Sequence, residues 1–114
     1  GTEGKKAVNQ LGKVLAENPD INVLIEGHTD NDDFIGKGDI SDNWDLSTKR
    51  ATAIVTILQE NKTINAESLT AAGRSAYSPV ADNDSPEGKA KNRRIEVILT
   101  PKLDEVSKLL NEIK

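Results

Sequence analysis

The apolar periodicity of the sequence changes twice in its first half, and this change limits the folds open to the chain. Residues 4–18 place apolar side chains at helical spacing and stop before a proline, which predicts a helix. Residues 21–26 are β-branched and partly alternating, which predicts a strand that ends at Gly27. A long loop over residues 28–41 and a second helix, from about residue 42 to 61, follow. This order favours one sheet with helices covering a face.

The second helix has a clear start and an amphipathic face. Asp42 is a plausible N-cap, and Asp45 follows three residues later in an arrangement like a capping box. We expect one stripe of this helix to face the sheet. The stripe consists of Leu46, Arg50, Ile54, Ile57 and Leu58.

The second half of the chain holds two more strand candidates. Residues 69–74 predict a short strand, and residues 77–91, with two prolines and a glycine, predict a loop. Residues 93–100 alternate well, which predicts a strand. Its apolar face holds Ile95, Val97 and Leu99, and its polar face Arg94 and Glu96.

The last segment, residues 101–114, predicts an amphipathic helix opened by Pro101. The order is therefore α-β-α-β-β-α, which predicts an α+β fold with a single mixed sheet and helices packed on one face. With 114 residues, the chain has the size of one domain, residues 1–114.

Charge and composition exclude several classes of function. Fifteen basic against nineteen acidic side chains give a net charge of −4, which disfavours nucleic-acid binding and docking on anionic lipid. The sequence has no run of apolar residues long enough to span a bilayer. It has no cysteine and only one histidine, His28, so we expect no metal site and no cofactor. Because the sequence does not begin with Met, we interpret it as part of a longer protein.

Charged groups of interest lie at the end of the first strand and at the start of the second helix. Asp30 follows the strand, and Arg50 lies in the helix. Such a pair can neutralise itself, or it can be held apart to bind a zwitterion, with the carboxylate on an ammonium and the guanidinium on a carboxylate. The residues alone leave both readings open.

Four motifs in order carry a family resemblance. They are Ile25-Glu26-Gly27-His28-Thr29-Asp30; Asn43-Trp44-Asp45-Leu46-Ser47-Thr48-Lys49-Arg50-Ala51; Gly73, Pro79, Asn83 and Glu87-Gly88; and Asn92-Arg93-Arg94-Ile95-Glu96. Over about residues 3–100 the chain resembles the OmpA-like C-terminal domain, the peptidoglycan-binding module also found in Pal lipoproteins and MotB-type motor stators. The Asn43-Trp44-Asp45-Leu46-Ser47 form resembles the motor-stator branch, which also carries an extended loop at the place of residues 31–42.

The resemblance implies a site for the diaminopimelate of the peptidoglycan stem peptide. Asp30 matches the residue that binds its amino group, and Arg50 the residue that binds its carboxylate. Thr29, Asn43 and Leu46 match residues that line the same pocket, and Asn92 and Arg93 match the tail motif. A lysine at this place in the stem lacks the second carboxylate and forfeits a charge-assisted bond of about 1.5–3 kcal/mol. We therefore expect a preference for the Gram-negative type of stem.

The resemblance also implies a non-catalytic role. It predicts a periplasmic domain that anchors an outer-membrane or inner-membrane attached parent to the cell wall. A MotB-type stator is the alternative parent, and a wall hydrolase with Glu26 and Asp30 as its acid pair is less favoured. The family's βαβαββ-type fold has a first strand that residues 1–3 cannot supply. We leave open that this strand lies outside the sequence, and that a homodimer replaces it.

Three further residues carry narrower expectations. Trp44 is as well suited to packing as to ligand contact. Arg93 and Arg94 are neighbours in a predicted strand and point to opposite faces, so we expect one in a structural ion pair and the other at the site.

Overall fold

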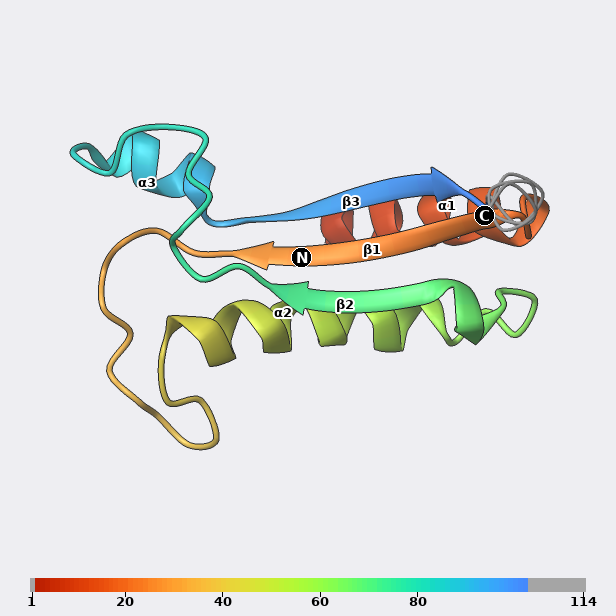
Figure 1. Ribbon diagram of the computed structural model, residues 1–114, viewed down its shortest axis with the longest axis horizontal. Helices are drawn as coiled ribbons and strands as arrows, with labels where there is room; N and C mark the ends of the chain where they lie inside the picture. Colours follow the sequence, from red (N-terminus) through yellow and green to blue (C-terminus); the bar gives the residue numbers. More distant parts are fainter. Residues whose placement is uncertain (1, 103–114) are drawn as a thin grey trace, which may run out of the picture.

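The computed structural model describes residues 2–102, which form one three-stranded sheet, three α-helices and a 3₁₀ turn. The strand order is β2-β1-β3, with β1 parallel to β2 and antiparallel to β3 (Figure 1). The predicted α+β class and single mixed sheet are confirmed. The elements are α1 (Thr2–Glu17), β1 (Ile21–His28), α2 (Asn43–Leu58), η1 (Ala66–Ser68), β2 (Leu69–Gly73), α3 (Pro86–Asn92) and β3 (Arg94–Pro101).

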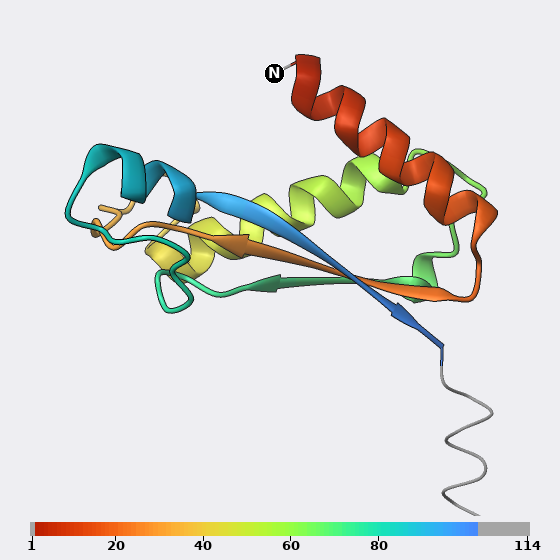
Figure 2. The ribbon, with the colours of Figure 1, turned by 90° about the horizontal axis from the view of Figure 1, so that it is seen from above.

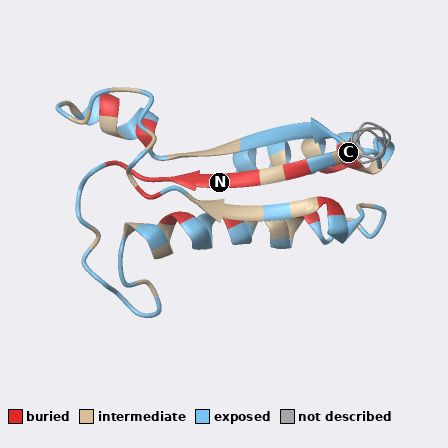
Figure 3. Ribbon diagram, viewed as in Figure 1, coloured by how far each residue is buried: buried red, intermediate tan, exposed pale blue. Residues whose placement is uncertain are grey.

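Helices α1 and α2 lie on the same face of the sheet, as expected, and α3 lies beyond the ends of the strands (Figure 2). The central strand β1 is the most buried element (Figure 3). Aliphatic side chains build the core between this strand and the two helices. The fully buried members are Leu15, Val23, Ile25, Ala51 and Leu58.

Two glycines let α2 lie directly on the sheet. Gly27 of β1 and Gly73 of β2 are neighbours in the parallel register. A Cβ atom at Gly27 would overlap the carbonyl oxygen of Ser47, and one at Gly73 would overlap the side chain of Thr48. The first half of α2 is therefore held against the strand ends by backbone-to-backbone contact.

This close approach also corrects the predicted stripe of α2. Small residues, Ser47 and Ala51, occupy the centre of the buried face together with Leu58, and Ile54 is half-buried beside them. Arg50 is exposed, so its place in the predicted stripe is wrong. Larger side chains flank the contact because the glycines leave no space between helix and sheet.

The predicted start of α2 is confirmed. Asp42 is the N-cap, and its Oδ1 accepts a hydrogen bond of 2.9 Å from the backbone N–H of Asp45. The Asp45 carboxylate in turn accepts from the backbone N–H and the hydroxyl of Ser41, at 3.1 and 2.7 Å. These bonds lower the pKa of Asp45 below its ordinary value, the Ser41 hydroxyl bond most.

The predicted loop over residues 77–91 is wrong in its last third, because Pro86–Asn92 form α3. Ser85 is the N-cap of this helix, and its hydroxyl accepts a hydrogen bond of 3.0 Å from the backbone N–H of Gly88. Pro86 follows it at a first helical position, where proline is favourable. Gly88 is needed there because a Cβ would overlap the carbonyl oxygen of Asp82.

The apolar face of β3 is the predicted one, but it is incompletely covered. Val97 and Leu99 pair with the buried residues Ile25 and Val23, so all four lie on the helix-covered face. Even so, Val97 and Leu99 remain partly exposed, because α2 packs on β1 and β2 rather than on this edge strand. The helix predicted for residues 101–114 falls almost wholly beyond residue 102, outside the described residues.

Candidate functional site

Asp30 lies just past the carboxyl end of β1 and is buried together with Thr29. Its Oδ1 accepts a hydrogen bond of 3.0 Å from the backbone N–H of Asp32. Its Oδ2 lies 2.6 Å from Nη1 of Arg93. The hydroxyl of Thr29 donates to the Asp30 carbonyl at 2.8 Å, and its N–H to the carbonyl of Ser75 at 2.9 Å. The carboxylate is thus held on a fixed backbone.

Arg93 reaches Asp30 because it directly follows α3, at the start of the edge strand. Its side chain is about half exposed, whereas the Asp30 side chain is almost covered. Its neighbour Arg94 pairs instead with Glu96, at 2.7 Å. Each arginine therefore has its own carboxylate, Asp30 for Arg93 and Glu96 for Arg94, and Arg93 lies just before β3 rather than in the strand as predicted.

Arg50 lies on a flank of α2 together with Asn43 and Leu46, at helical spacings of three and four residues. The opposite flank carries Thr48, which lies against β2, so the Arg50 flank faces away from that strand. Within residues 2–102 Arg50 has no ion-pair partner, and Asp30 is neutralised by another arginine.

Asn43 and Lys89 tie the long loop to its surroundings through one residue, Asp32. The Asn43 amide donates to the Asp32 carbonyl at 2.9 Å, and the Lys89 ammonium lies 2.8 Å from the Asp32 carboxylate. The hydrogen bond to Asp32 raises the pKa of Lys89. The loop after Asp30 is thus fixed to α2 on one side and to α3 on the other.

Asn92 is fully buried and has all of its side-chain hydrogen bonds within the segment before α3. Its Oδ1 accepts from the N–H groups of Val80 and Ala81, at 2.8 and 3.0 Å. Its Nδ2 donates to the Ala81 carbonyl and to Oδ1 of Asn83, at 3.0 and 2.8 Å. It positions this segment and α3, and through them Arg93.

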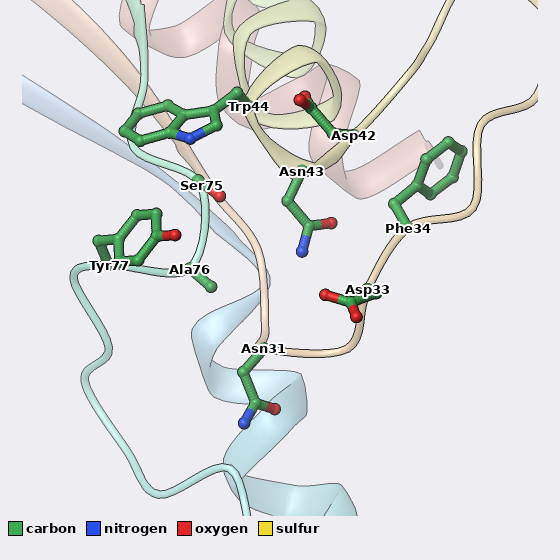
Figure 4. Close-up of a pocket in the computed structure, with 9 residues that line it drawn as sticks. All are labelled: Asn31, Asp33, Phe34, Asp42, Asn43, Trp44, Ser75, Ala76 and Tyr77. Carbon is green, nitrogen blue, oxygen red and sulfur yellow. The ribbon is translucent and has the colours of Figure 1, made fainter.

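A cavity of about 490 Å³ opens beside Asn43, between the start of α2 and the loops that follow β1 and β2 (Figure 4). The rings of Trp44 and Tyr77 stack along one wall, with centroids 5.4 Å apart and planes tilted by 32°. The sequence pattern left Trp44 open and gave no indication of Tyr77, because only the fold brings these residues together. The lining residues are Asn31, Asp33, Phe34, Asp42, Asn43, Trp44, Ser75, Ala76 and Tyr77.

A second cluster, Glu26, His28 and Glu96, places one imidazole nitrogen and two carboxylate oxygens within 4.8 Å of one another. Its donor set would suit a divalent cation. However, Arg74 and Arg94 each pair with one of the carboxylates, at 3.5 and 2.7 Å, and already balance their charge. Nδ1 of His28 is buried without a partner among the described residues, whereas a metal-bound histidine usually donates that N–H to an acceptor. We therefore interpret the cluster as a structural ion-pair network.

The chain has a mixed sheet, a buried acid after its central strand and polar groups at the start of α2. These features define one class of α+β domain. The chain belongs to the OmpA family, whose model matches residues 2–93.

Particular relatives include motility protein B of Bacillus subtilis, 40% identical over 93 residues, or 82% of this chain and 35% of the relative. Peptidoglycan-binding protein ArfA of Mycobacterium tuberculosis H37Rv is 33% identical over 92 residues, or 81% of this chain and 26% of the relative. The chain therefore spans about a third or less of the curated relatives it matches.

The fold is also that of a solved structure, the periplasmic domain of Helicobacter pylori MotB. The two superpose with a TM-score of 0.79 at 22% identity, over 96% of this chain and 74% of the other. At this identity the likeness concerns the fold. None of the helices within residues 2–102 has the length and apolar character needed to cross a bilayer.

Proposed function

We propose that this domain binds peptidoglycan without catalysis, through the diaminopimelate of the stem peptide, and anchors a membrane-attached parent protein to the cell wall. The observation that carries the proposal is the buried carboxylate of Asp30, fixed at the carboxyl end of β1 by the N–H of Asp32 and the guanidinium of Arg93. Family membership supports the choice of ligand, and the relative ArfA is itself named a peptidoglycan-binding protein.

The charges suit a zwitterion. A carboxylate offers about four lone-pair sites, and among residues 2–102 two donors, Asp32 and Arg93, occupy those of Asp30. A ligand ammonium binds at the remaining sites. Arg50, without an ion-pair partner in the described part of the chain, binds the ligand carboxylate as a fork. Thr29, Asn43 and Leu46 line the space between, and Asn92 holds Arg93 in place.

The parent protein we propose is periplasmic and membrane-attached, and of the motor-stator type. The observation that favours this alternative over an outer-membrane parent is the 40% identity with motility protein B over 82% of the chain. The preference for diaminopimelate over lysine in the stem, and with it the Gram-negative type of wall, is the finer part of the same proposal.

A hydrolase is disfavoured by how the two candidate acids are used. Glu26 pairs with His28 and Arg74, at 3.3 and 3.5 Å, whereas Asp30 pairs with Arg93. The acids thus belong to separate ion-pair networks, and neither is placed as a free acid facing the other. A zymogram on purified peptidoglycan should show no clearing.

The test is a titration by NMR and calorimetry with meso-diaminopimelate, and with lysine as the control ligand. Polar contacts to a small ligand give modest affinity, so we expect a Kd between about 1 μM and 1 mM for diaminopimelate. Replacing Asp30→Asn should weaken binding by about 2–5 kcal/mol, because the ligand ammonium loses its partner. Asp39→Asn changes another acid of the same loop, whose side chain makes no hydrogen bond within residues 2–102, and should bind as wild type. An equal response to both ligands, or unchanged binding by Asp30→Asn, would contradict the proposal.

A further inference from the structure

Glu26 and His28 lie on the face of the sheet that α1 and α2 leave uncovered (Figure 2). They alternate along β1 with Gly27, which contacts α2, so they project to the opposite side. Both are nevertheless buried, and His28 is only 1% exposed. On the neighbouring strand β3, Glu96 is directly opposite Glu26 in the antiparallel register, and Arg94 is opposite His28. A buried histidine therefore lies among charged side chains.

The two carboxylates share one imidazole nitrogen. Nε2 of His28 lies 3.3 Å from Oε1 of Glu26 and 3.1 Å from Oε2 of Glu96. Like charges directly opposite each other in a sheet are destabilising, and a shared N–H donor between them offsets the repulsion. Nδ1 of His28 is buried without a partner among the described residues. A neutral imidazole with its proton on Nε2 leaves only an acceptor unpaired, whereas protonation adds a buried N–H without an acceptor and a charge.

Two arginines complete the charged groups that face His28 within residues 2–102. Arg74, which follows β2, lies 3.5 Å from Glu26, and Arg94 of β3 lies 2.7 Å from Glu96. With a neutral histidine, the two carboxylates and the two guanidinium groups balance in charge. A proton on His28 would make the group net positive and would place a second cation beside Glu96. The ion pair between Glu96 and Arg94 would then be weakened by competition.

The same network is connected to the Asp30 site from two sides. Along β1, Asp30 lies two residues after His28. Along β3, Arg94 donates a hydrogen bond of 3.1 Å to the carbonyl of Asn92, and the next residue, Arg93, pairs with Asp30. A charge at His28 therefore acts on the site directly, through its electric field, and indirectly, through the position of Arg94.

We propose that His28 is a positioning residue for the site at Asp30, and that its protonation in mild acid weakens the binding of a ligand ammonium there. This inference rests on the proposed function, because it concerns the same site. The imidazolium repels the ammonium and draws Glu96 away from Arg94, so both effects lower the affinity. The affinity is full while His28 is neutral and falls as the pH drops through the protonation of His28.

The sequence makes this dependence on pH simple to assign. Histidine is the side chain that ordinarily changes charge between about pH 5 and pH 8, and His28 is the only histidine. The first test is calorimetry of the whole protein with meso-diaminopimelate. From about pH 7.5 to about pH 5.5 the Kd of the wild-type protein should rise by about threefold or more. In His28→Gln, which keeps a polar side chain that does not titrate, the Kd should change by less than about twofold over the same range.

A second test follows the protonation of His28 itself by ¹³C NMR of the imidazole. By linkage, saturation with meso-diaminopimelate should lower the pH at which His28 takes up its proton. Glu96→Gln removes one carboxylate from the imidazolium and should lower that pH by about half a unit or more, with the loss of affinity moving to lower pH as well. The Glu96 side chain is 44% exposed, so this variant serves where His28→Gln does not fold.

A matched control is Glu67→Gln, which changes an exposed acid in η1, at the other end of β2, and should leave both titrations unchanged. Three results would overturn the inference: a Kd that is the same at both pH values, a dependence on pH that His28→Gln retains, or a protonation of His28 that the ligand does not shift. Binding at about pH 7.5 tests the proposed function separately. No binding at either pH would contradict the proposed function and this inference with it, whereas equal binding at both would contradict this inference alone.

Discussion

Asp30 and Arg93 are 63 residues apart in the sequence and form an ion pair of 2.6 Å at the end of the central strand. Each comes from a segment with its own anchor: Asp30 follows β1, and Arg93 follows α3, which Asn92 holds in place. The pair neutralises the buried carboxylate. In the proposed complex a ligand ammonium at Asp30 binds beside a guanidinium, and the coupling between the two residues determines how easily Asp30 accepts it.

The Asp30–Arg93 pair should contribute little to folding. Because the Arg93 side chain is 45% exposed, water screens the attraction. A double-mutant cycle of Asp30→Asn and Arg93→Gln, measured by urea unfolding, should give a coupling of at most about 1 kcal/mol. A coupling near 3 kcal/mol would instead indicate a buried pair and a site that is difficult for a cation to enter.

Two glycine-to-alanine substitutions should have opposite effects on the free energy of unfolding. Gly27→Ala places a Cβ on the Ser47 carbonyl, where backbone must move, and should lower it by about 1–3 kcal/mol or more. Gly4→Ala lies in α1 with open space around its Cβ position, and should raise it by up to about 1 kcal/mol. Chemical denaturation measures both. A neutral Gly27→Ala would mean that α2 does not lie on the sheet as closely as described.

The cap of α2 should make the free energy of unfolding depend measurably on pH in the acidic range. The pKa of Asp45 is lowered in the folded state, so its contribution to stability is present above the unfolded pKa and is lost as pH falls through the folded pKa. Ser41→Ala removes the hydroxyl that causes most of this shift. The Asp45 carboxyl, followed by ¹³C NMR, should then titrate at a higher pH, closer to its ordinary 3.8. The difference in stability between variant and wild type should be present at pH 6 and shrink below pH 3. A difference that persists in strong acid would assign the effect to something other than Asp45.

Asn92 should be costly to replace, because its buried amide makes four hydrogen bonds. Asn92→Ala leaves the N–H groups of Val80 and Ala81 without their acceptor, and should lower the free energy of unfolding by about 2–3 kcal/mol. Asn83→Ala removes only one of the four bonds and is the milder comparison. Equal stability of Asn92→Ala and wild type would show that the segment before α3 does not depend on this amide.

Local patterns in the sequence were sufficient for much of the fold. Helix α1, strand β1 and the capped start of α2 follow from periodicity and capping chemistry within a few residues, and all three lie where they were predicted. The short helix α3 was missed because Pro86 and Gly88 are usually loop residues. The Ser-Pro pair at its start was the available signal, since proline is favourable at the first position of a helix.

What the sequence by itself determined was the order of α1, β1, α2, β2 and β3, the single sheet covered on one face, and the position of Asp30 at a strand end. Only the tertiary structure decided which side chains meet there. Asp30 pairs with Arg93 rather than Arg50 because β3 lies antiparallel beside β1 and brings the end of α3 to the same edge. Trp44 and Tyr77 stack because Gly27 and Gly73 let α2 lie against the ends of β1 and β2. Such contacts between distant segments depend on register and on the closeness of backbones, which a local pattern does not encode.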